Sequence, residues 1–84
     1  MSDLQKDFQK ALEDVKQTNP NDETKLKLYG LYKQIHSGDN NTSKPWAYQL
    51  EKSYKWQAWK NNSGRSKDDC MMDYIILVNG LTQK

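Results

Sequence analysis

The chain has 84 residues, of which 35% are hydrophobic and 11% aromatic, with a mean hydropathy of −1.13 and a net charge of +2. This length suits one domain over residues 1–84 with a thin core. No apolar run approaches the roughly 18 residues of a membrane-spanning helix, and the N-terminus lacks the apolar stretch of a signal peptide, so we expect a cytoplasmic protein. A single cysteine and a single histidine cannot form an internal disulfide or a four-ligand zinc site, and the charge is too balanced to predict nucleic-acid binding by itself.

The first half of the chain predicts two amphipathic helices. The first opens with Ser2 and Gln5, which have the spacing of a capping box, and it ends at residues 18–20. Its apolar residues recur at helical intervals: Leu4, Phe8, Ala11, Leu12 and Val15. The second helix is expected to begin near residues 21–22, where Asn or Asp can cap it, and to run to about His36, with Gly38 as its terminator.

The second half predicts two more helices. The third is expected over about residues 48–62, with apolar contacts from Leu50, Tyr54 and Ala58, and we interpret Trp56 and Trp59 as core residues. The fourth opens at a capping box formed by residues 66–69. It carries Met71, Met72, Tyr74, Ile75, Val78 and Leu81. Four amphipathic helices in so short a chain predict an all-α, four-helix bundle.

The second helix has two distinct faces. Leu28, Leu31, Tyr32 and Ile35 share one arc of the helical wheel, which predicts the side facing the core. Leu26, Tyr29 and Lys33 lie together on a roughly opposite arc. One interpretation is a lysine stem lying over a partly exposed ring. The other is a surface for a ligand with phosphate and apolar parts, because lysine offers a point charge and tyrosine a hydroxyl and a stacking face.

Two further residue types need an interpretation. We expect His36 to be a surface residue at a helix C-terminus and Cys70 to be a small buried or half-buried residue.

The lysines and aromatic rings of residues 52–60 could also bind nucleic acid by stacking and phosphate contact, although the patch is short. Neither a glycine-rich phosphate loop nor a pair of catalytic carboxylates is recognisable, so we expect no enzymatic activity.

The order of the motifs resembles that of the acyl-CoA-binding protein family. The run Leu28–Gln34 resembles the family's Y-x-x-Y-K-Q segment, and Lys55–Trp59 resembles its K-W-x-A-W element. Gly64, residues 66–69 and Tyr74 are similar to its last element, G-x-S-K-E-D-A-x-x-x-Y. The resemblance implies a bundle with up-down-down-up topology that binds medium- or long-chain fatty acyl-CoA without chemistry. It further implies a monomeric intracellular carrier and pool former that delivers its ligand to acyl-CoA-using enzymes, with no metal, no other cofactor, no nucleic acid and no stable membrane insertion.

The same resemblance implies a set of ligand-binding residues. Lys33 and Lys55, together with Tyr29, correspond to the residues that receive the 3′-phosphate of CoA. The other positions carried over from the family are Lys16, Gly30, Leu31, Tyr32 and Tyr74. The alternative function is a helical interaction module that binds nucleic acid or a protein through its lysines and aromatic rings.

The sequence also departs from the family pattern. The connection over residues 17–20 is short, which affects the transfer of the assignment to Lys16. Lys25 and Lys27 stand where apolar residues are common near the acyl groove, and Trp46 and Tyr54 are bulky where small residues are usual. These changes leave the preferred acyl-chain length open.

Overall fold

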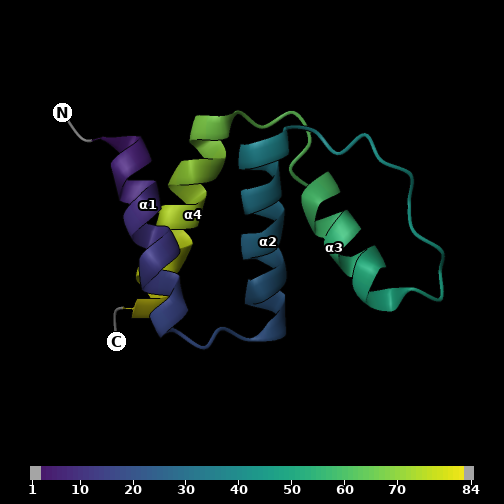
Figure 1. Cartoon of the computed structure of the whole chain (residues 1–84), viewed down its shortest axis with the longest axis horizontal. Coiled ribbons are helices and arrows are strands. Elements are labelled where there is room, and N and C mark those ends of the chain that lie inside the picture. Colours follow the sequence, from purple (N-terminus) through teal and green to yellow (C-terminus); the bar gives the residue numbers. More distant parts are fainter. Residues whose placement is uncertain (1–2, 83–84) are drawn as a thin grey trace.

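The computed structural model of the protein describes residues 3–82, and all of its regular structure is helical (Figure 1). Helix α1 spans Leu4–Asp14 and continues into a short 3-10 turn, η1, over Val15–Gln17. Helix α2 spans Asp22–Ser37, α3 spans Leu50–Lys60 and α4 spans Lys67–Thr82. The prediction of an all-α protein with four helices is therefore confirmed.

Local side-chain caps fix where most of the helices begin. The Asn21 side chain accepts a hydrogen bond of 2.8 Å from the Thr24 amide, and the Ser66 hydroxyl accepts one of 3.1 Å from the Asp69 amide, as the sequence predicted. At the start of α1 the cap is Asp3, which accepts from the Lys6 amide at 3.2 Å. The expected cap, Ser2, lies outside the described residues.

Two helix ends also bear on the predictions. Helix α2 stops at Gly38, whose φ of 75° lies in the left-handed region that glycine tolerates, so the expected terminator is confirmed. Helix α3 is shorter at both ends than the expected 48–62. It ends at Lys60 because the amides of residues 62 and 63 bond carbonyls three residues back, in turns, and Gly64 follows with a φ of 83°.

Helices α2 and α3 stand beside one another, and α1 lies across α4, whose C-terminal half passes behind it in the view of Figure 1. Helix α4 packs against α1 and α2, and α2 packs against α4 and α3. The chain runs one way along α1 and α4 and the opposite way along α2 and α3, which is the expected up-down-down-up topology (Figure 1). The Cα atoms extend 42 × 26 × 14 Å, so the molecule is flattened and has two broad faces.

The core lies between α1, α4 and α2. It consists of Phe8, Ala11, Leu28, Leu31, Ile35, Cys70, Met71, Tyr74 and Val78. The predicted stripe of α1 and most of that of α4 are among these residues or pack against them. On α2, the side predicted to face the core is buried at Leu28, Leu31 and Ile35. Tyr32 was expected on the same side, but it is 40% exposed and lies against His36. Cys70 is fully buried and His36 is exposed, as expected.

Helix α3 contributes no fully buried residue. The interpretation of Trp56 and Trp59 as core residues is therefore wrong. Their indole nitrogens donate hydrogen bonds to the α2–α3 loop, from Trp59 to the Gly38 carbonyl at 2.7 Å and from Trp56 to the Thr42 hydroxyl at 3.0 Å. Leu50 and Tyr54, which were predicted to supply apolar contacts, are mostly exposed, at 59% and 58%.

The α2–α3 loop is held in place by hydrogen bonds of polar side chains, one of which, Asn40, is fully buried. The Asn40 side chain donates to the Trp56 carbonyl at 3.1 Å. The Asp39 carboxylate accepts hydrogen bonds of 2.8 Å from the Gly64 amide and from the Gln34 side chain. These bonds favour the ionised form and lower the pKa of Asp39. The loop thus ties α3 to the end of α2.

Candidate functional site

A hollow of about 420 Å³ opens on one broad face, between the α1–α2 connection, α2 and α4. Four of the residues carried over from the family line it: Lys16 from η1, Tyr29 and Tyr32 from α2, and Tyr74 from α4. The other lining residues are Val15, Thr18, Pro20, Lys25 and Leu28. Its volume lies within the range of small-molecule sites, so the fold gathers distant parts of the chain into a ligand-sized space.

The hydroxyl of Tyr74 is kept protonated by its surroundings. The residue is 5% exposed, and its ring meets that of Phe8 edge to face, with the centroids 5.2 Å apart. Burial, and to a smaller extent the proximity of Tyr32, raises the pKa of Tyr74. The phenol can therefore donate a hydrogen bond to an anionic or carbonyl oxygen.

Lys16 stands at the rim of this hollow. Its ammonium lies 3.4 Å from the Glu13 carboxylate, and both side chains are largely exposed. Such an exposed pair contributes little to stability. The Lys16 ammonium can therefore leave Glu13 for a more highly charged anion at little cost.

A second hollow, of about 360 Å³, lies between α2 and α3. It is lined by Asp22, Lys25, Leu26, Glu51, Tyr54 and Lys55. Because Lys25 lines both hollows, they are neighbours on the N-terminal half of α2. The first hollow has three tyrosines in its lining, and the second has Leu26 and a single tyrosine, Tyr54.

Two lysines lie over aromatic rings across the α2–α3 contact. The Lys55 ammonium is 5.8 Å from the ring centroid of Tyr29, and that of Lys33 is 4.7 Å from the ring of Trp59. Residues 29 and 33 are one turn apart on α2, as are residues 55 and 59 on α3, so the two cation–π pairs are adjacent. Lys55 also lies 3.2 Å from Glu51, in a pair whose carboxylate is mostly exposed.

Gly30 and Leu31 have packing positions outside these hollows. A Cβ atom on Gly30 would stand 2.2 Å from the Ala58 carbonyl oxygen, so only glycine lets α3 approach α2 this closely. Leu31 is 6% exposed in the core and reaches the opposite broad face of the molecule. Six of the eight expected residues thus surround the hollows and their lysine–ring pairs, and these two do not.

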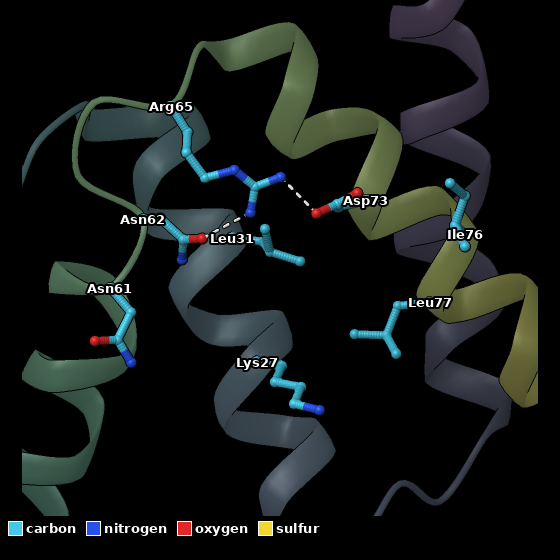
Figure 2. A pocket seen from close by; sticks show the side chains of 8 residues that line it. All are labelled: Lys27, Leu31, Asn61, Asn62, Arg65, Asp73, Ile76 and Leu77. Atoms are coloured by element: carbon cyan, nitrogen blue, oxygen red, sulfur yellow. Dashed lines mark hydrogen bonds and ion pairs between the residues drawn. The ribbon is translucent and has the colours of Figure 1, made fainter.

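A third cavity, of about 350 Å³, opens between α2 and α4 and is seen in Figure 2. On α2 its residues, Lys27 and Leu31, lie on the side of the helix opposite Lys25 and Tyr29. Its one guanidinium, that of Arg65, donates to Asn62 and Asp73 (Figure 2) and also to Asp69. These carboxylates raise the pKa of Arg65 and neutralise its charge. The cavity therefore does not offer an unpaired guanidinium to an anion.

Some lining residues were not found from the sequence. Lys25 was noted only as a departure near the acyl groove and not as a ligand-binding residue, although its i, i+4, i+7 relation to Tyr29 and Tyr32 carried a signal for it. Thr18 and Pro20 carried none, because their position depends on how the α1–α2 connection folds over α2 and α4. Among residues 3–82, no group of three or more His, Cys, Asp or Glu side chains could hold a metal ion.

The fold and these hollows define a small helical domain whose broad face can hold a polar ligand between α2 and its neighbours. The model of the family described as "Acyl CoA binding protein" matches residues 5–78, and the chain belongs to that family. The chain is 42% identical to rice (Oryza sativa) Acyl-CoA-Binding Protein 2, whose crystal structure superimposes with a TM-score of 0.87. That match covers 94% of this chain and 90% of the rice chain.

Two further relatives show similar identity. The acyl-CoA-binding protein of Saccharomyces cerevisiae is 43% identical over 67 residues, which are 80% of this chain and 77% of the yeast protein. The acyl-CoA-binding domain-containing protein 3 of rice is 45% identical over 83 residues, which are 96% of this chain. The chain spans only about half of that rice protein, 54% of its length.

Proposed function

We propose that the protein binds medium- or long-chain fatty acyl-CoA without chemically changing it. The observation that carries this proposal is the gathering of Lys16, Tyr29, Tyr32 and Tyr74 in one hollow, from three separate elements. A nucleotide needs stacking faces, hydroxyl donors and cations close together, and this hollow offers all three. The names of the relatives point to the same ligand.

In this proposal the CoA end lies over the tyrosines and the lysine–ring pairs. Lys33 and Lys55, with Tyr29, receive the 3′-phosphate through charge-assisted hydrogen bonds, which are stronger than neutral ones. Their positions over aromatic rings hold both ammonium groups at the α2–α3 contact before a ligand arrives. Lys16 and Tyr74 contact the nucleotide from the other side of the hollow.

The acyl chain is assigned to the second hollow, between α2 and α3. Leu26 and Tyr54 offer apolar surface there, whereas Lys25 and Glu51 are polar at its rim. Burial of an acyl chain contributes about 0.8 kcal/mol for each CH₂ group removed from water. Gly30 and Leu31 act in this proposal through packing rather than through ligand contact.

The cellular role that follows is that of a carrier and pool former. We propose that residues 1–84 act as one monomeric cytoplasmic domain that releases acyl-CoA to enzymes that use it. No helix within residues 3–82 is long and apolar enough to cross a membrane. No observation favours the alternative of a nucleic-acid-binding module.

The test is isothermal titration calorimetry with palmitoyl-CoA, and with free CoA as the comparison ligand. We expect Lys33→Ala and Lys55→Ala each to weaken palmitoyl-CoA binding by about tenfold to a hundredfold, the loss expected for hydrogen bonds to a charged group. Lys6→Ala, on the exposed side of α1, is the matched control and should bind like the original protein. Unchanged affinity in both site variants would contradict the assignment.

A further inference from the structure

Four large apolar side chains are exposed together where α3 begins. Trp46 is 72% exposed, Tyr48 80%, Leu50 59% and Tyr54 58%. They come from the end of the α2–α3 loop and the first turns of α3, at one end of the long axis of the molecule (Figure 1). We call these four residues the aromatic patch. With the exception of Tyr54, the patch lines none of the three hollows described above.

The patch is displayed by an ordered turn. The Gln49 amide donates to the Trp46 carbonyl at 2.9 Å, and the Gln49 side chain accepts from the Trp46 amide at 3.3 Å. The Ser53 hydroxyl also donates to the Trp46 carbonyl, at 3.4 Å, which ties the turn to α3. Leu50 and Tyr54 are neighbours at i and i+4 on the helix. These hydrogen bonds order the turn that carries Trp46 and Tyr48 and join it to α3.

Positive charge is concentrated in the same region. Residues 40–64 contain four lysines and one glutamate, a net charge of +3, whereas the whole chain carries only +2. The rest of the chain is therefore slightly acidic. Of these lysines, Lys44 and Lys52 flank the patch in the sequence. Lys55 is paired with Glu51, and Lys60, at the other end of α3, donates to the Asn40 carbonyl at 3.2 Å.

We propose that the aromatic patch docks the protein reversibly on an anionic lipid bilayer. Tryptophan and tyrosine favour the membrane–water interface, where the ring is apolar and its polar edge stays wet. Nearby lysines are attracted to anionic headgroups. Tryptophan and tyrosine are enriched at protein interfaces too, but lysine is depleted there, so the lysines that flank the rings favour the bilayer as the partner. The patch is small, so the docking is peripheral and reversible and spans no part of the bilayer.

Docking also places a ligand hollow at the lipid surface. Tyr54 belongs to the patch and lines the hollow between α2 and α3. An acyl chain can then pass between the bilayer and that hollow with little exposure to water. This last step rests on the proposed acyl-CoA binding, whereas the docking itself does not.

The test is co-sedimentation with vesicles of phosphatidylcholine, alone or mixed with phosphatidylserine, at low and at high salt. We expect binding to the mixed vesicles that weakens as salt screens the lysines. The double variant Trp46→Ala/Tyr48→Ser should bind at least about tenfold more weakly, because less apolar area enters the interface. Lys44→Gln/Lys52→Gln should lose about fivefold for each lysine.

Two controls separate this proposal from the proposed function. Ile76→Ala removes an exposed apolar side chain, 64% accessible on α4, from outside the patch and should leave vesicle binding unchanged. Lys33→Ala should bind vesicles normally while losing palmitoyl-CoA affinity in solution, and Trp46→Ala/Tyr48→Ser should show the reverse. No binding to the mixed vesicles at low salt would overturn the proposal. Vesicle binding by Trp46→Ala/Tyr48→Ser that equals that of the original protein would also overturn it. A third contrary result would be salt-sensitive binding of single-stranded RNA that displaces the protein from the vesicles.

Discussion

A methyl group added at Gly30 tests whether the close contact of α2 and α3 forms the site. In Gly30→Ala the new Cβ would lie 2.2 Å from the Ala58 carbonyl oxygen, whereas ordinary contact begins at 3.4 Å. The obstacle is backbone, so no side-chain rotation can relieve it. Helix α3 must therefore move away from α2 by about 1.2 Å, the difference between these two distances.

The expected magnitude follows from two opposing effects. Alanine in a helix interior is about 1 kcal/mol more favourable than glycine. Overpacking typically costs 1–3 kcal/mol, and an unyielding backbone contact places Gly30→Ala near about 3 kcal/mol. The net loss is then about 2 kcal/mol in the free energy of unfolding, or a fall in Tm of roughly 10 °C for a domain of this size.

Gly80→Ala is the matched control, because it makes the same chemical change inside α4, where a Cβ meets nothing within 4 Å. It should raise the free energy of unfolding by up to about 1 kcal/mol. Differential scanning calorimetry shows whether each variant is more or less stable than the original protein. Titration with palmitoyl-CoA should show weaker binding for Gly30→Ala alone, because Lys55 moves away from Tyr29. If Gly30→Ala proved as stable as Gly80→Ala, the reasoning would be refuted.

Two further predictions concern the pH dependence of stability and the reactivity of the thiol. The hydrogen bonds to Asp39 lower its pKa in the folded state, so their contribution is present above the ordinary aspartate pKa of about 4 and is lost as the pH falls through the lower folded value. The Tm of the original protein should therefore fall more steeply in this acidic range than that of Asp39→Asn, and parallel curves would contradict this account. Cys70 is fully buried, and burial raises the pKa of its thiol. Iodoacetamide at neutral pH should alkylate the native protein far more slowly than the guanidinium-unfolded chain, and equal rates would show that the thiol is accessible.

The sequence predicts structure best where the cause is local. Asn21 and Ser66 bond amides three residues away, so the short segments that contain them already indicate where α2 and α4 begin. The stripe of α1 is equally local in its periodicity, and Phe8 and Ala11 are buried as it indicates.

Helix α3 shows why the rest could not be predicted. The rings of Trp56 and Trp59 resemble core residues in any local pattern. Their actual neighbours are the α2–α3 loop and Lys33, because α3 stands at the edge of the molecule and packs on one helix only. Which helix lies at an edge depends on the order of all four elements in space, and no single segment encodes that order.

The candidate site, too, could be predicted only in part from the sequence. The family motifs located the tyrosines and lysines, and four of these residues do meet in one hollow. Gly30 lies in the middle of the same motif, yet its role is to admit the Ala58 carbonyl from another helix. A motif identifies which residues belong together, whereas their division between ligand contact and helix packing emerges only from the fold.

The pairing of α1 with α4 has a consequence for how the chain folds. These helices lie at opposite ends of the sequence, and within residues 3–82 the backbone of α1 approaches that of no other long helix. The loop that must close to join them contains α2 and α3, and the entropic cost of closing a loop rises with its length. The α1–α4 contact is thus the most non-local in the protein, so mutations in α1 should report when along the folding pathway the two ends of the chain meet.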